Sequence, residues 1–345
     1  MRGRAARRDP FDAGATRFVL EQPVLTSVAT AKAKKRDQEV TVGRRKLKLT
    51  NLDKVLYPKA KTTKAEVIDY YARVADVMLP HLRGRPLTLR RFPEGVGNPA
   101  ASFFEKNCPK HRPEWVKTTP IYVDRRAGEI DFCLCENLAT LTWMAQLAAL
   151  ELHPSLSKAT RMEQPTVLAF DLDPGKPAAL LDCCQVALRV RQLFSAFGLE
   201  SYPKVSGGKG LQVYVPLNTK VTYEQTSPFA KAVAQLLEKQ TPKQVVSKMA
   251  KASRRGKVFV DWSQNHQKKT TIAVYSLRAR DYPTASMPLH WREVERAVKR
   301  EDADDLRFEI PDAIRRIEKE GDLFEPVLKM KQKLPDVAEL DTEDA

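Results

Sequence analysis

Apolar residues recur along this chain in runs that switch between the spacing of helices and the spacing of strands. Apolar stripes with helical spacing predict helices over 64–79, 137–150, 178–197, 223–238 and 310–333. Short apolar or β-branched runs predict strands over 86–92, 115–123, 130–135, 166–170, 257–262 and 271–280, with two more around the glycine-rich turn at 206–210. This mixture predicts an α/β (α+β) fold.

The central stretch is residues 165–175, PTVLAFDLDPG, in which a buried strand is expected to end at a Pro-Gly turn. Side chains two apart on a strand share a face, so Asp171 and Asp173 place two carboxylates side by side at the strand's carboxyl end. Two such acids repel each other unless a cation lies between them, which favours a metal site. An ordinary Asp-Pro-Gly turn is the alternative.

The charge of the chain indicates the kind of partner that it binds. The 345 residues, 42% hydrophobic and 30% charged, suffice for one large core or two smaller ones. The formal net charge is +16; residues 1–45 carry 11 Lys or Arg against 5 Asp or Glu, and residues 301–345 carry 7 against 15. The middle of the chain is therefore itself basic, which indicates a polyanionic partner such as nucleic acid.

Other classes are disfavoured. No apolar stretch is long enough to span a membrane, and MRGRAARRDPFDAG lacks the apolar core of a secretory signal. Five cysteines, an odd number without a disulfide spacing, fit a reducing cytoplasm. A zinc site from Cys108 with His111 or from Cys133 with Cys135 is disfavoured, since neither pair has finger spacing.

Basic and acidic residues flank further predicted strands. Asp261 ends the apolar run KVFVDW as a third carboxylate, and Arg278 and Arg280 share one face of the predicted strand 271–280. This pattern suits a metal–triphosphate, although salt bridges between edge residues would give it too. The turn at 206–210 is not a P-loop, but its glycines let backbone amides approach a phosphate while Lys209 supplies charge.

Three features of the first half have two interpretations each. Phe103 and Phe104 beside Lys106 are either core residues or a base-stacking platform with a phosphate contact. Residues Asn51, Lys54 and Lys64 near a predicted helix start, capped by Thr62-Thr63, are either solvated or an anion site. The hairpin formed by 115–123 and 130–135 would present Arg125 and Arg126 at its tip.

Three strand-end aspartates, a glycine-rich turn with a lysine and two arginines together indicate phosphoryl or nucleotidyl transfer. Carboxylates would hold two metals that bridge the attacking hydroxyl and the α-phosphate, while Lys and Arg neutralise the outer phosphates. All-oxygen ligation suits Mn²⁺ and Mg²⁺ equally. No general base from the protein is required.

The sequence here resembles a known family, the archaeo-eukaryotic primase superfamily, and within it the polymerase domain of bacterial ATP-dependent DNA ligase D. The resemblance covers roughly residues 46–300 and rests on motifs in the family's order: LTNLDKVLYP…TTK, FFEKN, DLDPG, SGGKGLQVYVPL, DWSQN and YSLRAR. It implies two α/β units, the second RRM-like, around one active site. It also implies metal-dependent addition of ribo- or deoxyribonucleotides (NTP or dNTP) at DNA gaps and breaks, as in non-homologous end joining.

The resemblance assigns roles residue by residue. Asp171, Asp173 and Asp261 match the metal ligands. The nucleotide-contacting positions are Phe103, Phe104, Lys106, His153, Ser206, Lys209, Gln212, Arg278 and Arg280. Asn51, Lys54 and Lys64 match the pocket for the 5′-phosphate of the downstream strand, and Arg125 and Arg126 become candidates for DNA synapsis.

Two departures qualify these expectations. The family's second motif commonly ends in histidine where this chain has Gln212, which predicts weaker triphosphate affinity rather than loss of activity, because glutamine donates only a neutral hydrogen bond. The ligase signature KxDG is absent, so we expect a freestanding polymerase that works with a separate ligase, plausibly with Ku. We expect it in the bacterial cytoplasm, associated with the nucleoid.

The predicted organisation is a basic arm at 1–45, a catalytic domain at 46–300 and a helix with an acidic tail at 301–345. A DNA-end-binding module without catalysis is the alternative function, which the three aspartates oppose because unused buried carboxylates are costly. De novo priming is the alternative within the enzyme class.

Overall fold

The structure, a computed structural model, describes residues 37–124 and 128–338. The described chain opens with a hairpin of β1 (Gln38–Val42) and β2 (Arg45–Leu49). This hairpin begins before Arg45, where the sequence predicted the folded part to start. Strand β1 is short and mostly polar, so its pattern gives little signal, and its pairing with β2 defines it.

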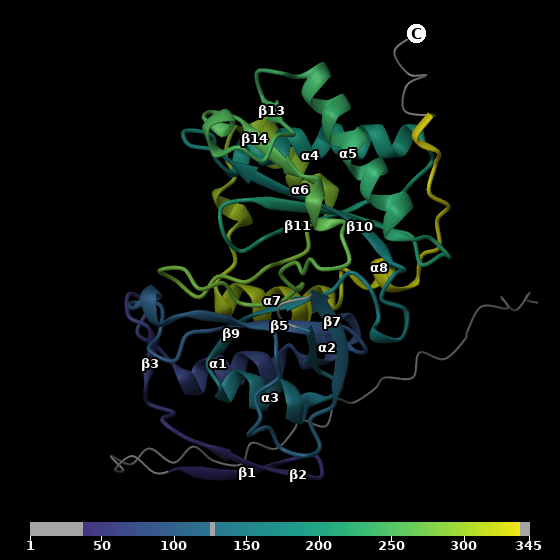
Figure 1. The fold of residues 1–345 in the computed structure, drawn as a ribbon. Helices are drawn as coiled ribbons and strands as arrows, with labels where there is room; N and C mark the ends of the chain where they lie inside the picture. Colours follow the sequence, from purple (N-terminus) through teal and green to yellow (C-terminus); the bar gives the residue numbers. More distant parts are fainter. Residues whose placement is uncertain (1–36, 125–127, 339–345) are drawn as a thin grey trace, which may run out of the picture. The chain divides into compact units, whose positions relative to one another are not determined.

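An antiparallel sheet of five strands organises the first half of the described chain. Its strands are β6 (Phe103–Glu105), β5 (Pro86–Arg91), β8 (Gly128–Leu134) and β7 (Thr118–Asp124) in spatial order, with β9 (Ala149–Pro154) also paired to β5. The helices α1 (Lys64–Arg73), α2 (Ala75–Leu82) and α3 (Leu138–Gln146) lie together beside this sheet (Figure 1). A small hairpin of β3 (Val55–Tyr57) and β4 (Thr62–Thr63) leads into α1.

Two predicted helices of this half have different bounds in the structure. The helix predicted over 64–79 is two helices, because Val74 leaves the helical conformation between α1 and α2. The helix predicted over 137–150 ends at Gln146, and the apolar run continues as β9. Apolar residues fill both sides of each break, so the hydrophobic pattern does not mark it.

A second five-stranded sheet contains the aspartates. Its spatial order is β11 (Tyr202–Val205), β12 (Leu211–Pro216), β10 (Val167–Pro174), β14 (Val258–Asp261) and β13 (Val245–Val246). The strand predicted at 166–170 is thus the central one, as β10. Helices α4 (Leu180–Ala196) and α5 (Tyr223–Gln240) contact β10, and α6 (Trp291–Arg300) contacts α4 (Figure 1).

The segment 270–289 connects the two sheets and is not the strand that its β-branched residues predicted. It bonds to β9 through the backbone N–H of Ala273, which donates to Leu152 at 2.9 Å, and to β11 through the Met287 carbonyl, which accepts from Val205 at 2.9 Å. Its backbone partners are therefore divided between two sheets, so no continuous ladder forms. The predicted C-terminal helix is likewise two helices, α7 (Ile310–Glu320) and α8 (Glu325–Lys329).

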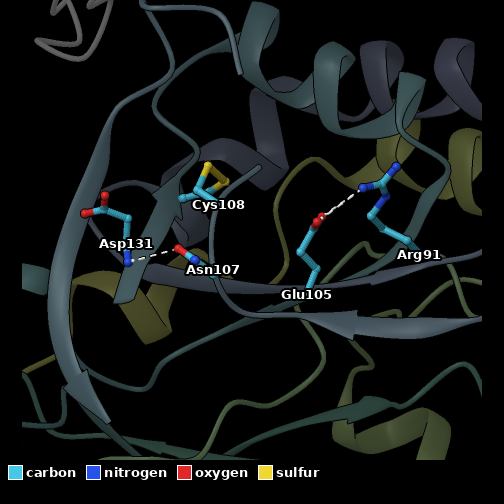
Figure 2. The surroundings of a disulfide bond; sticks show 6 residues. Arg91, Glu105, Asn107, Cys108 and Asp131 are labelled. Atoms are coloured by element: carbon cyan, nitrogen blue, oxygen red, sulfur yellow. Dashed lines mark hydrogen bonds and ion pairs between the residues drawn. A yellow bond between two sulfur atoms is a disulfide. The ribbon is translucent and has the colours of Figure 1, made fainter. Parts of the chain in front are cut away.

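A disulfide joins Cys108, in the loop after β6, to Cys133 of β8. Figure 2 shows it beside the hydrogen bond that the Asp131 backbone N–H donates to Asn107 at 3.2 Å. The prediction of unpaired cysteines is therefore wrong for these two, which were also weighed as zinc ligands. Sequence spacing does not reveal the pair, because it is a backbone hydrogen bond between the loop and β8, from Cys108 to Asp131, that brings together two cysteines 25 positions apart.

Within the described ranges, no helix has the length and apolar character needed to cross a membrane.

Candidate active site

A cavity of about 270 Å³ lies where β9, β10, β12, the turn after β11 and the segment 270–289 meet. It brings together nine of the residues predicted from the sequence: Phe104, His153, Asp171, Asp173, Ser206, Lys209, Gln212, Arg278 and Arg280. Positions from five separate regions of the sequence thus share one concave site, which is where binding sites usually form.

Asp171 and Asp173 line this cavity, and Asp261 lies next to them without being one of its lining residues. Asp261, the last residue of β14, is the cross-strand partner of Asp171. Burial, then the charges of Asp173 and Asp261, raise the pKa of Asp171 to about 7. Gln212, the partner of Asp171 on the other side, opposes this increase by hydrogen bonding. A bound cation would relieve the repulsion.

The donor set suits a hard divalent cation, but Asp261 is engaged elsewhere in this conformation. Its Oδ1 accepts hydrogen bonds from the backbone N–H and the hydroxyl of Ser263, at 3.0 and 2.6 Å, and its Oδ2 accepts one from Gln264 at 2.7 Å. Over 37–124 and 128–338, no three His, Cys, Asp or Glu side chains converge well enough to hold one metal ion. Asp171 and Asp173 therefore fit as a preformed pair, which Asp261 would join by exchanging these hydrogen bonds.

The turn between β11 and β12 forms another wall. Ser206 donates through its hydroxyl to the Gly210 carbonyl at 3.0 Å and accepts from the Gly208 N–H at 3.2 Å. Gly207 has φ +72°, and a Cβ there would come within 2.8 Å of Ala285. Lys209 reaches back to donate to the Pro174 carbonyl at 3.1 Å. The turn is thus fixed against β10 with its lysine beside the aspartates.

Positively charged side chains also line the cavity. Arg278 and Arg280 reach the cavity although the strand expected to align them is absent. Burial and the neighbouring Arg278 lower the pKa of Arg280, and burial lowers that of His153 despite the opposing effect of Glu151. Cations and carboxylates in one cavity provide the electrostatic pattern that a metal-bound polyphosphate requires.

The aromatic pair lies at the rim. Phe103 and Phe104 on β6 are exposed over 43% and 59% of their surface, so they are not core residues. Arg91 lies over the Phe103 ring, at 5.2 Å from its centroid, and Arg90 lies over the Phe104 ring at 5.1 Å. Phe104 lines the cavity, whereas Phe103 and Lys106 are not among its lining residues.

The three residues Asn51, Lys54 and Lys64 come together at the start of α1. The Lys64 N–H donates to the Lys54 carbonyl at 2.8 Å, and the Lys54 N–H donates to the Asn51 carbonyl at 3.1 Å. Thr63 caps the helix in a capping box with Glu66, as the Thr62-Thr63 motif predicted. Burial, then Lys54 and Arg91, lower the pKa of Lys64 to about 8. These positive groups meet the helix dipole at one point, which favours an anion.

Sequence reasoning missed four residues around the cavity. Gln264 lines it and holds Asp261; Arg90 and Glu151 contact its basic wall; and Lys204 lies fully buried behind the aspartates. Burial lowers the pKa of Lys204 to about 7, while Asp171 opposes this. Glu151 and His153 are two apart on β9, a spacing that places both side chains on one face of the sheet. Only the pairing of β9 with β5 shows that Glu151 also meets Arg90.

Arg125 and Arg126, predicted for synapsis, lie outside the described residues. Strands β7 and β8 on either side of them form the expected hairpin.

Two sheets meet at a cavity that holds strand-end aspartates together with a lysine, a histidine and two arginines, a set of groups that suits a nucleotidyltransferase. A family profile described as "LigD, primase-polymerase domain" matches residues 63–324. The chain therefore belongs to the LigD primase-polymerase domain family, which confirms the family, the fold and the enzyme class expected from the motifs.

Individual relatives agree. The "Multifunctional non-homologous end joining protein LigD" of Mycolicibacterium smegmatis is 43% identical over 284 residues, covering 82% of this chain and 36% of that protein. The "Bifunctional non-homologous end joining protein LigD" of Bacillus subtilis is 34% identical, covering 80% of this chain and 43% of that protein. The chain thus spans less than half the length of these relatives.

A solved structure matches the fold over nearly all of its own length. The "Polymerase Domain from Mycobacterium tuberculosis Ligase D in complex with DNA" superposes with a TM-score of 0.74 at 40% identity, covering 83% of this chain and 99% of that chain.

Proposed function

We propose that this chain adds ribo- or deoxyribonucleotides to DNA ends at gaps and breaks, in a metal-dependent reaction that serves end joining or gap repair. The observation that carries the proposal is that one cavity is lined by Asp171 and Asp173 together with Lys209, Arg278 and Arg280. Nine of its lining residues are positions that the family motifs assign, and its acidic and basic groups complement a metal-bound nucleoside triphosphate.

The basic residues would bind and orient the triphosphate. Lys209, Arg278, Arg280 and His153 donate to the outer phosphates, and Ser206 with the glycine-rich turn offers short polar contacts. Mn²⁺ or Mg²⁺, two ions held by the three aspartates, would polarise the α-phosphate and activate the attacking hydroxyl. Phe103 and Phe104 would stack on a base, with Lys106 near the phosphates.

The group formed by Asn51, Lys54 and Lys64 would bind the 5′-phosphate of the downstream strand. Its support is the convergence of two lysines at the start of a capped helix, together with the buried position of Lys64. A dianionic 5′-phosphate bound by these residues would fix the position of the DNA gap relative to the cavity. Lys54 currently pairs with Glu94 at 3.0 Å and would exchange this partner for DNA.

Partners and organisation follow as proposals. The relatives' names link them to non-homologous end joining, so a broken or gapped duplex is the proposed DNA substrate, with Ku and a separate ligase as proposed partners. We propose a functional division into a basic arm that ends before the β1–β2 hairpin, a catalytic domain and a C-terminal segment at 301–345. Arg125 and Arg126 stay proposed synapsis residues.

Extension of a labelled primer across a short gap, with and without a downstream 5′-phosphate, tests this proposal. It would compare ribo- and deoxyribonucleotides, and manganese with magnesium. We expect extension that the 5′-phosphate stimulates, and loss of that stimulation in Lys64→Ala. Extension without any effect of the phosphate would favour a priming enzyme. Phosphate-dependent binding without extension would make the chain an end-binding module.

A further inference from the structure

Glu151 is a buried carboxylate behind the basic wall of the cavity. It lies on β9, exposed over only 1% of its surface, and its cross-strand partner on β5 is Arg90. His153 follows two residues later on the same strand, so both side chains point to one face of the sheet. Glu151 is not among the residues that line the cavity, whereas His153 and Arg278, which contact it, are.

Both oxygens of Glu151 are occupied by groups that face the cavity. Oε2 lies 3.0 Å from Nε2 of His153 and 3.5 Å from the Arg90 guanidinium. Oε1 accepts the backbone N–H of Ala279 at 3.0 Å and lies 3.5 Å from Nε of Arg278. One carboxylate therefore touches two basic side chains of the cavity wall, as well as the backbone between Arg278 and Arg280.

The carboxylate is ionised in this environment. Burial alone would raise its pKa, but His153 and Arg278 outweigh burial and hold the pKa of Glu151 at about 2. Burying a carboxylate is costly because the charge loses its hydration. Hydrophobic residues can often replace buried ion pairs without loss of stability, so stability alone does not explain a carboxylate here. The Glu151 charge offsets the guanidinium groups of Arg90 and Arg278, which would otherwise repel each other.

The same network reaches the aromatic rim. The His153 ring contacts Phe104 edge-on, with centroids 5.7 Å apart, and Arg90 lies over Phe104 from β5. Glu151 thus contacts both His153 and Arg90, the two side chains that pack against Phe104. Nε of Arg278, buried and without a hydrogen-bond partner, depends on this carboxylate for compensation of its charge.

We propose that Glu151 is a positioning residue, which orients His153 and Arg278 toward the triphosphate and steadies Phe104 beneath the base. This inference rests on the proposed function, because it names what organises the nucleotide site. Glu151 does not touch the substrate itself. Replacing Glu151 should weaken nucleotide binding much more than it weakens DNA binding at Asn51, Lys54 and Lys64, the proposed site for the 5′-phosphate.

The test compares Glu151→Gln with a matched control on the same sheet. Glu105 of β6 forms an ion pair with Arg91 at 3.1 Å (Figure 2), as Glu151 does with Arg90, and neither Glu105 nor Arg91 lines the cavity. KM and kcat for the nucleotide would be measured in gap extension. The Kd for ATP with Mg²⁺ would be measured by calorimetry, and the Kd for 5′-phosphorylated gapped DNA by anisotropy.

We expect KM and Kd for the nucleotide to rise about 10- to 100-fold in Glu151→Gln, the effect of losing charge-assisted contacts, with a smaller change in kcat. Glu105→Gln should leave both values within about twofold. Glu151→Asp, which keeps the charge at a shorter reach, should fall between wild type and Glu151→Gln. DNA affinity should stay unchanged in all three variants.

The outcomes separate the two levels of the proposal. Wild-type protein that adds no nucleotide would refute the proposed function, and the ATP Kd of the variants would still decide the role of Glu151. Active wild type with an unchanged nucleotide KM in folded Glu151→Gln would refute the positioning role. If Glu151→Gln fails to fold, Glu151→Asp decides: a raised KM supports the role and a wild-type KM overturns it.

Discussion

At the scale of single residues, Asp171 carries a large electrostatic cost. It is partly buried beside two other carboxylates, and its pKa rises to about 7. Between the unfolded pKa of about 3.9 and this value, the folded protein binds a proton that the unfolded chain has lost. In the absence of metal, the free energy of unfolding should therefore fall as the pH rises from about 5 to 8.

Asp171→Asn tests this dependence, because the amide keeps the shape and cannot ionise. In EDTA we expect the stability of the variant to change less with pH than that of wild type, as measured by urea unfolding at each pH. Added Mn²⁺ should stabilise wild type more than the variant. Parallel pH curves for the two proteins would contradict the assignment of this cost to Asp171.

Gln212 has a more specific position than its motif predicted. It pairs across the sheet with Asp171, it is buried, and its Oε1 has no hydrogen-bond partner. The prediction of weaker triphosphate affinity stands: a histidine there can become charged and donate toward a phosphate, as an amide cannot. Gln212→His should lower the nucleotide KM in gap extension, with kcat measured alongside, and an unchanged KM would count against the prediction.

Lys64 should make DNA affinity at the proposed 5′-phosphate site depend on pH. Burial and neighbouring cations lower its pKa to about 8, so the lysine loses its charge as the pH rises through that value. The affinity advantage of 5′-phosphorylated over 5′-hydroxyl gapped DNA should decline between pH 7 and about 9. Anisotropy titrations measure it, and Lys64→Arg is the matched variant, since arginine stays charged. An equal decline in both proteins would exclude Lys64 as the cause.

At the scale of elements, the disulfide between Cys108 and Cys133 joins the loop after the aromatic strand β6 to β8. Closing a loop of 25 residues stabilises a fold by about 2–4 kcal/mol, chiefly through the unfolded chain. Cys133→Ser should lose about this much in urea unfolding without reductant. Wild type in dithiothreitol should approach the variant, and equal stability of oxidised wild type and Cys133→Ser would contradict this.

The elements show how far the sequence pattern reaches. The central strand β10, the glycine-rich turn and the cap at Thr63 were predictable, because each has a local signal in apolar spacing, glycine or capping residues. The segment 270–289 was not, since β-branched residues indicate extended backbone but not which sheet will pair with it. Arg278 and Arg280 were therefore predicted correctly as neighbours of the cavity, from a strand that does not exist.

The candidate site, like the helices and strands, was predictable only where its residues belong to short local motifs. Motif residues such as Asp171 and Lys209 follow from chemistry carried on short stretches. Glu151 and Lys204 have no motif of their own, and their roles arise from burial against partners that are distant in sequence. Cys108 and Cys133 likewise pair only because tertiary structure brings them together. Long-range contacts of this kind are not encoded in local spacing.

At the scale of the whole molecule, charge and fold agree with the family. The described residues from 37 on form one unit by their internal contacts, and the formal net charge of the chain is +16. A positive surface draws DNA in through long-range attraction that salt weakens. Within this unit, acidic residues gather at the end of the second sheet, where the basic walls of the cavity surround them.

The central claim is that this cavity transfers nucleotides, and single-nucleotide addition tests it most directly. A labelled primer at a 5′-phosphorylated gap would receive one nucleotide from wild type or from Asp171→Asn, with Mn²⁺ or Mg²⁺ and with EDTA. We predict addition by wild type only with a divalent cation, and none by the variant, which should still bind the gapped DNA. Addition by Asp171→Asn at the wild-type rate would contradict the account.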